Sequence, residues 1–261
     1  MIQTSPSLQT LYPDSDGKPM AENTEQYEWI VRLVTNLKYL LKDKVAFVAG
    51  DLLWYPVEVE EPPAPCQAPD AMVALGRPPG YRGSYKQWEE DNIAPQVAFE
   101  ILSPSNTRRE MAEKQKFYED YGVLEAYYYD PQRKDFWGFV REQSGDIFTL
   151  ITALYLPWTS PLLQIRFELF NDGLAVFYPN SEPFAEPGTI LLERDVVKAE
   201  RDAALLAQQQ ARAERDAAWL AQQQARADRD RALLEEEQAR AKLNQALAKL
   251  QELGIDPGTL S

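Results

Sequence analysis

Three ionisable residues occupy positions that the surrounding apolar sequence would otherwise give to a core. Asp70 precedes the apolar run AMVAL, Glu100 ends the run QVAFE, and Lys114 lies in the segment that follows. At about 100° per residue, Lys114 falls at the centre of the apolar stripe of a helix, whereas Lys116 points away from it. A lysine on a buried face is costly unless it is paired, so carboxylates on the adjoining strands are its natural partners. The pattern therefore predicts that Asp70, Glu100 and Lys114 meet at one site.

Such a constellation has a definite chemistry. Two carboxylates held close together repel each other unless a proton or a cation intervenes, and an all-oxygen ligand set selects a hard ion such as Mg²⁺, with Mn²⁺ as a substitute. The ion can lower the pKa of a bound water, while a nearby ammonium stabilises the charge that develops in phosphodiester cleavage. Asp70 and Glu100 are therefore candidate metal ligands, and Lys114 completes a candidate catalytic trio.

The same three residues also have an ordinary interpretation. Asp70 follows a proline and can cap a turn, Glu100 can lie at an exposed strand end, and Lys114 can form a common surface salt bridge. The residue pattern alone leaves both interpretations open.

The composition excludes several other kinds of site. The chain of 261 residues contains no histidine, which rules out Ser-His-Asp triads, histidine-ligated zinc and haem with a proximal histidine. The single cysteine, Cys66, cannot form an internal disulfide or a cysteine-based zinc site. A formal charge of −14 argues against a surface coated with basic residues for nonspecific polyanion binding. Because no stretch of about 18 apolar residues occurs, we expect a cytoplasmic protein that does not enter a membrane.

The elements that would position the trio follow from periodicity. Residues 27–41 carry an apolar stripe in three- and four-residue steps, which predicts an amphipathic helix. Short apolar runs near residues 46, 71 and 97 have strand length, and residues 135–151 have the pattern of a hairpin around Ser144 and Gly145. Between them, Thr107 and Glu110 fit a capping box, and Gly122 is placed to end the helix. This order predicts a mixed α/β sheet flanked by helices over residues 21–192, after a flexible or loosely docked arm over residues 1–20.

The composition changes abruptly at residue 193. The segment AERDAALLAQQQAR recurs as AERDAAWLAQQQAR and more loosely as ADRDRALLEEEQAR, a period of two heptads. We expect one long helix over residues 193–253 and a short tail over residues 254–261. Its seam is partly polar, so the pattern allows either a weakly self-associating coiled coil or a lone solvated helix. The lattice runs through Leu206, Ala213, Leu220, Ala227, Leu234 and Ala241.

The residues around the trio also resemble a known family. Pro69-Asp70 followed by an acid in an apolar strand resembles the PD-(D/E)XK nuclease superfamily. The runs APDAMVALGRPPGYRGSYKQWEE and PQVAFEILSPSNTRREMAEKQKFYEDYGVLEAYYYDP are more closely similar to the Uma-two family of restriction-endonuclease-like proteins. The resemblance covers residues 21–192 and implies a restriction-endonuclease-like fold with Mg²⁺-dependent cleavage of DNA.

The resemblance assigns roles by position. Asp70 matches the first acid of the motif and Glu100 the second, but Leu102 stands where the superfamily has lysine. The family places its lysine in the following helix, where Lys114 lies. Glu22 matches an additional acid of many such nucleases, although acids are common at helix N-termini in any case, and Asp51 has the same two interpretations. The cations that flank the site are either phosphate contacts or solvated surface, namely Arg82, Lys86, Arg108 and Arg109.

Two functions from different classes follow. The first is a metal-dependent DNA endonuclease that works as a homodimer or higher oligomer, because two cuts in a duplex need two sites. The second is a noncatalytic interaction protein that keeps the nuclease fold and works through its C-terminal helix, an alternative favoured by the leucine at position 102. RNA and single strands stay open as substrates, since the chemistry acts on the phosphodiester and does not itself select the polymer.

Overall fold

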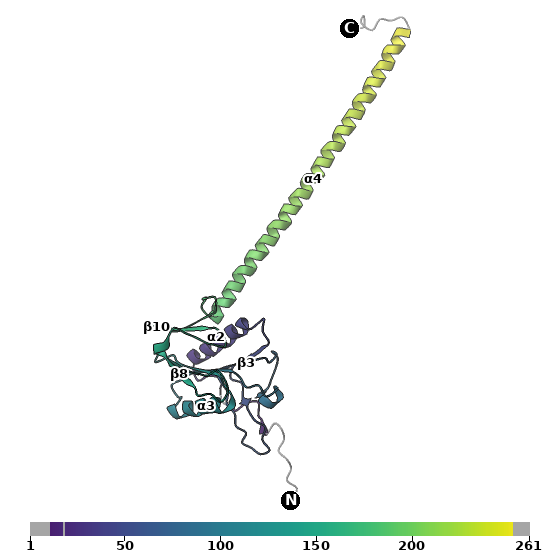
Figure 1. Cartoon of the computed structure of the whole chain (residues 1–261). Helices are drawn as coiled ribbons and strands as arrows, with labels where there is room; N and C mark the ends of the chain where they lie inside the picture. The colour runs from purple at the N-terminus through teal and green to yellow at the C-terminus, as the bar shows by residue number, and fades with distance from the viewer. Residues whose placement is uncertain (1–10, 18, 253–261) are drawn as a thin grey trace. The chain divides into compact units, whose positions relative to one another are not determined.

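The protein divides into a globular unit, residues 1–191, and a helical unit, residues 192–261 (Figure 1). The structure is a computed structural model that describes residues 11–17 and 19–252. The predicted C-terminal tail, residues 254–261, and the first ten residues of the predicted arm lie outside the described residues.

A six-stranded mixed sheet forms the centre of the globular unit. Its order is β1-β3-β5-β6-β7-β8, and only β5 and β6 run parallel, because the helix α3 connects them. The remaining neighbours are antiparallel, including the β7–β8 hairpin that the sequence predicts. The mixed α/β prediction, with flanking helices and a long C-terminal helix, is thereby confirmed. The strands are β1 (Ala46–Ala49), β3 (Ala71–Leu75), β5 (Val97–Ile101), β6 (Glu125–Asp130), β7 (Asp135–Val140) and β8 (Thr149–Thr152).

Helix α2 (Thr24–Leu40) covers one face of this sheet. Asn23 caps it by accepting a hydrogen bond from the backbone N–H of Gln26. Leu33 and Leu37 bury their side chains against the sheet, whereas Tyr27, predicted on the apolar stripe, is exposed. A second sheet of order β11-β10-β9 contributes to the same core. Its strands are β9 (Trp158–Thr159), β10 (Arg166–Phe170) and β11 (Gly173–Phe177).

Helix α3 (Arg108–Tyr121) contributes to a separate core with the other face of the sheet, where Met111 and Tyr118 pack in one cluster with Ala98. Its ends are fixed by local sequence. Thr107 and Glu110 form the predicted capping box, and Gly122 ends the helix in the left-handed region at φ 102°. A separate two-stranded parallel sheet, β2 (Trp54–Tyr55) with β4 (Tyr85–Lys86), contributes Trp54 and Tyr85 to the same cluster. The register of α3, and hence the direction of Lys114, is therefore set at both ends.

The N-terminal arm is anchored where the structure describes it. Tyr12, within the segment expected to be flexible or loosely docked, is only 3% exposed, and its ring packs against Tyr55 and Trp88. Its hydroxyl donates a hydrogen bond to the carbonyl of Val59, and the Tyr55 hydroxyl donates to the carbonyl of Pro13. The arm is therefore docked at these residues, because the Tyr12 side chain combines an apolar ring that packs with a hydroxyl that forms a hydrogen bond.

A single helix, α4 (Pro187–Glu252), forms most of the C-terminal part of the chain. It begins six residues before the predicted start, with proline at its first position, where the missing N–H costs nothing. Pairs of exposed apolar side chains recur along it every fourteen residues, at Leu205 and Leu206, Trp219 and Leu220, and Leu233 and Leu234. Within residues 11–17 and 19–252, no helix combines the length and apolarity needed to cross a bilayer.

Replacing Gly122 with alanine should destabilise the globular unit by roughly 1–3 kcal/mol, because alanine is strained at positive φ. An added Cβ would also lie 3.2 Å from the Cβ of Ala94. Denaturant unfolding of the full chain measures the change. Gly145→Ala is the matched control, since Gly145 has φ 100° but nothing within 4 Å of the added atom. An equal loss of stability in both variants would contradict the role given to the contact with Ala94.

Candidate active site

The pairing of β3 with β5 brings the two predicted acids together. Ala71 lies opposite Phe99, and extending this antiparallel register by one residue places Asp70 opposite Glu100. Residues directly opposite each other in an antiparallel pair lie on the same face of the sheet. Both side chains are buried, with Asp70 7% and Glu100 2% exposed. These acids therefore face each other under α3 instead of lying at a solvated strand end.

Lys114 reaches Glu100 from α3. Its Nζ donates a hydrogen bond to Oε2 of Glu100 at 2.6 Å, and its side chain is only 16% exposed. One turn later on the same helix, the hydroxyl of Tyr118 donates to Oε1 of Glu100. Lys116 points outward and pairs with Asp120 at the surface, as the helical wheel predicts. Both carboxylate oxygens of Glu100 thus have a partner from α3, while the catalytic role of the trio stays a prediction.

Asp70 has an unusual protonation equilibrium. Its pKa is raised to about 8, chiefly by burial and next by repulsion from Glu100. The ammonium of Lys114 and a 2.6 Å hydrogen bond from the backbone N–H of Ile101 to Oδ2 oppose it. Near neutral pH, Asp70 is therefore mainly protonated unless another cation enters the site.

Lys114 and Tyr118 remain proton donors across the ordinary pH range. Desolvation lowers the pKa of Lys114, but attraction to Glu100 and Asp70 outweighs it and leaves that pKa above its usual value. Burial and the proximity of Glu100 raise the pKa of Tyr118 well above the ordinary tyrosine value. The site thus holds one persistent ammonium beside two carboxyl groups.

Gln26 belongs to the surroundings of the site, and the sequence analysis did not identify it. Its side-chain Nε2 donates to the carbonyl of Ile101 at 2.9 Å, while its Oε1 accepts from the backbone N–H of Glu22 at 2.9 Å. Since Asp70 accepts from the N–H of Ile101, both backbone polar groups of Ile101 are held by side chains. A signal existed in the sequence, because Gln26 lies four residues before Ile30 on the buried stripe of α2.

Glu22 and Leu102 belong to the surroundings of β5. The carboxylate of Glu22 accepts hydrogen bonds from the hydroxyls of Ser103 and Ser105, in the loop after the strand. Leu102 donates its backbone N–H to the carbonyl of Tyr129 and contributes its side chain to a cavity of about 590 Å³. This cavity is lined by the loop after β5 and by residues of α3, β6 and β7, and Asp70, Glu100 and Lys114 are not among its lining residues. Residues that line it include Arg108, Met111, Gln115, Tyr128 and Trp137.

Asp51 is a third carboxyl group in the electrostatic environment of the trio. Its backbone has φ 48° and donates a hydrogen bond from N–H to the carbonyl of Pro69. Burial and then Asp16 raise its pKa, and the charges on Lys114 and Glu100 also act on it. Over the residues that the structure describes, no three acidic or cysteine side chains lie close enough together to form a ready metal cage.

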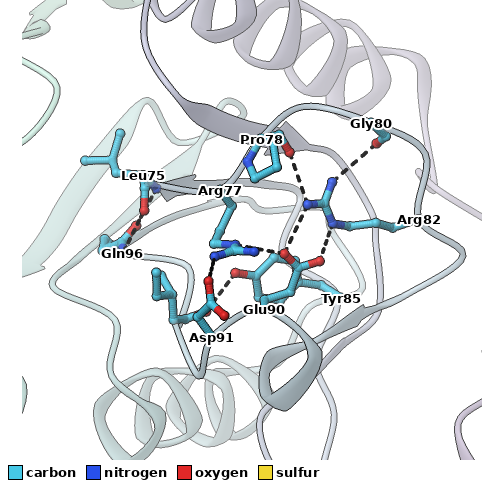
Figure 2. A network of polar contacts seen from close by, with 10 residues as sticks. Leu75, Arg77, Pro78, Gly80, Arg82, Tyr85, Glu90, Asp91 and Gln96 are labelled. Atoms are coloured by element: carbon cyan, nitrogen blue, oxygen red, sulfur yellow. Dashed lines mark hydrogen bonds and ion pairs between the residues drawn. The ribbon is translucent and has the colours of Figure 1, made fainter.

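Most of the predicted phosphate-contacting cations are already paired. Arg82 donates to Glu90 and to the carbonyl of Pro78, and Arg77 donates to Glu90 from the other side (Figure 2). The hydrogen bond from Arg82 is the main cause of the lowered pKa of Glu90, which burial opposes. Arg82 therefore holds its own loop in place. Lys86 pairs with Glu89 and Arg109 with Glu113, whereas Arg108 is exposed at the cavity.

Replacing Asp70 with asparagine should stabilise the protein increasingly as pH rises. The folded pKa of about 8 lies above the unfolded value of about 3.9, so the folded state binds the proton more tightly. Stability is then lost as pH rises between these values, by up to roughly 1.4 kcal/mol per unit. Thermal unfolding of both proteins without divalent cations, from acid to mildly alkaline pH, measures the difference. Asp43→Asn, at an exposed acid, controls for net charge; a difference independent of pH would contradict the raised pKa.

Comparison with known proteins identifies the family of this chain. A family described as "putative restriction endonuclease", Uma2, matches residues 15–176. Among solved structures, a protein from Anabaena variabilis ATCC 29413 described as a "putative nuclease belonging to DUF820" aligns over 56% of this chain and 77% of its own, with 15% identity and a TM-score of 0.40. No curated protein matches the chain. Since the matched residues span more than half of the sequence and include Asp70, Glu100 and Lys114, this chain belongs to the Uma2 family.

Proposed function

We propose that this protein is a Mg²⁺-dependent endonuclease that hydrolyses DNA phosphodiester bonds. One observation carries the proposal. In a chain of the Uma2 family, the Nζ of Lys114 lies 2.6 Å from a buried carboxylate, Glu100, that stands opposite a second buried acid, Asp70. An ordinary surface salt bridge does not need this burial. The lone cysteine accords with action in the reducing cytoplasm.

The residues present fit a hard divalent cation. Mg²⁺ is commonly bound through only one or two carboxylates and keeps several waters, so Asp70 and Glu100 would suffice to hold it. Each oxygen of Glu100 accepts one hydrogen bond, from Lys114 or Tyr118, and a carboxylate oxygen has a second lone pair. When bound, such a cation makes a water more acidic and polarises a phosphoryl oxygen. Mn²⁺ has similar ligand preferences and should substitute.

The side chains of the protein then have separable tasks. Asp70 must lose its proton to become a ligand, which ties binding of the cation to its raised pKa. Lys114 stays protonated and can donate to a phosphate oxygen as negative charge develops there. Tyr118 holds Glu100 in position. Leu102 provides no charge, so Lys114 would supply from the helix what the superfamily lysine supplies from the strand.

A second candidate function, a noncatalytic scaffold, is favoured by α4. Its paired apolar side chains are about half exposed, from 51% at Leu233 to 62% at Leu220, and their fourteen-residue spacing equals two heptads. If α4 paired in parallel with α4 of a second copy, each apolar pair would lie beside the same pair of the other helix. For the endonuclease, the same pairing would supply a homodimer with two active sites. Self-association is therefore compatible with both functions and does not decide between them.

Lys114→Met should lower the rate of Mg²⁺-dependent cleavage by about 10²-fold to 10³-fold, because it removes a positioned donor at the developing charge. Lys116→Met, on the same helix, should cut at the wild-type rate, since Lys116 is exposed and pairs with Asp120. Conversion of supercoiled plasmid is the measurement, with single-stranded DNA and RNA as parallel substrates. Circular dichroism checks folding, and Lys114→Arg tests whether charge alone restores activity. Equal rates for both methionine variants would reject the mechanism; no cutting of any polymer by the wild type would favour the scaffold.

Affinity for Mg²⁺ should increase between slightly acidic pH and about pH 8, because the cation competes with the proton on Asp70. Isothermal titration in two buffers of different ionisation enthalpy measures both the affinity and the protons released. Glu100→Gln should abolish binding, whereas Glu113→Gln, at an exposed acid on α3, should not change it. Tight binding with no release of protons would contradict the assignment of Asp70 as a ligand.

A further inference from the structure

The described lysines of the globular unit fall into two groups. Four of them have a polar partner in the fold: Lys86 with Glu89, Lys114 with Glu100, Lys116 with Asp120, and Lys134 with the carbonyl of Asn171. The other three are Lys38, Lys42 and Lys44. Within residues 11–17 and 19–252, none of these three side chains forms an ion pair or donates a hydrogen bond, and all three residues are exposed. Lys42 only places its Nζ over the ring of Tyr39.

These three lysines line one hollow of about 360 Å³, here called the lysine hollow. Lys38 lies in the last turn of α2, Lys42 follows four residues later, and Lys44 comes just before β1. Pro79 and Gly80 also line the hollow. Asp43, within the same run of sequence, is not among the residues that line it. Like charges at four-residue spacing repel, so gathering them in one concave place is unfavourable without an anionic partner.

The wall at Pro79 and Gly80 is held by the arginine network of the same loop. Arg82 donates to the carbonyls of Pro78 and Gly80, and Glu90 anchors Arg82 in turn (Figure 2). The guanidinium of Arg82 also lies over Phe47, another residue of the hollow. This network fixes the shape of the lysine hollow without neutralising its lysines.

Two ordinary effects explain part of this pattern. The C-terminal end of a helix favours a nearby cation, and lysines at an edge strand such as β1 discourage pairing with other chains. Each effect accounts for a lysine at one position. Neither requires three unpaired lysines around a hollow with a braced wall, in a chain whose formal charge is −14.

We propose that the lysine hollow binds phosphate groups of a nucleic-acid backbone and holds the substrate in place for the candidate active site. The proposal rests on the proposed function for its choice of polyanion. β1 and β3 are antiparallel, with Ala46 opposite Leu75, so the hollow and Asp70 lie toward opposite ends of β3. Five residues of strand span roughly 17 Å, or about five phosphate spacings along one strand of DNA. Contacts of this kind position the polymer and do not read its sequence.

The experiment measures binding separately from cleavage. The full chain is titrated with a fluorescein-labelled DNA duplex in Ca²⁺ and a series of KCl concentrations, and anisotropy gives the affinity at each salt concentration. One triple variant carries Lys38→Gln, Lys42→Gln and Lys44→Gln. The matched control carries Lys116→Gln, Lys134→Gln and Arg166→Gln, which removes the same charge from partnered cations outside the active site. Thermal unfolding verifies that both variants are folded.

The slope of log affinity against log salt should become less steep by about 0.9 for each phosphate that the protein no longer neutralises, hence by up to about 3 in the hollow variant. The control should keep the wild-type slope. An unchanged slope in the hollow variant, an equal change in the control, or equally tight, lysine-dependent binding of polyglutamate would each overturn the proposal. Plasmid cleavage in Mg²⁺ is scored separately. If the wild type cuts DNA but the hollow variant keeps the wild-type slope, the lysine hollow does not bind phosphates and the endonuclease proposal stands. If the slope changes but the wild type does not cut, the lysine hollow binds phosphates and the endonuclease proposal fails.

Discussion

The buried ion pair between Glu100 and Lys114 constrains the rest of the globular unit. An ionised carboxylate at 2% exposure is tolerated only with compensating charge and hydrogen bonds, and removing one partner of such a pair typically costs about 3–5 kcal/mol. Lys114 and Tyr118 can both reach Glu100 only if α3 has one rotation about its axis. The capping box at Thr107 and the left-handed Gly122 set the limits of that helix. The residues that cap α3 therefore also help to orient Lys114 and Tyr118 toward Glu100, which lies on β5.

Asp70 shows that this arrangement is not the most stable one available. Its pKa of about 8 means that folding opposes its ionisation, so the acid weakens the fold at the pH where a ligand must be ionised. Asparagine could accept the same hydrogen bond from Ile101 without that cost. Groups that trade stability for chemistry are expected at functional sites. A bound cation would offset both the repulsion from Glu100 and the desolvation of Asp70.

Positive charge in this acidic protein is divided between structural and unpaired positions. Arg77 and Arg82 are bound to Glu90 and brace the loop between β3 and β4, so their charge is directed inward. The lysine hollow and Arg108 are not paired in this way and face solvent. A local basic place on an acidic surface favours one docking position for a polyanion, since the surrounding acids repel it elsewhere. The structural arginines therefore support substrate placement indirectly, by shaping one wall of the hollow.

Much of the candidate site was predictable because the signals are local. A period of 3.6 residues decides which face of α3 carries Lys114, alternation along β5 decides the face of Glu100, and turn residues limit both elements. The class of fold and the long helix follow from the same patterns. Gln26, the anchored Tyr12 and the pairing of Arg82 were not predicted. Tyr12 meets Val59 across 47 positions and Gln26 meets Ile101 across 75. The sequence by itself determined which side chains point into the layers, because that depends on neighbours a few residues away. Only the tertiary structure decided which of them meet and which cations stay unpaired, because those contacts join segments that no local periodicity relates.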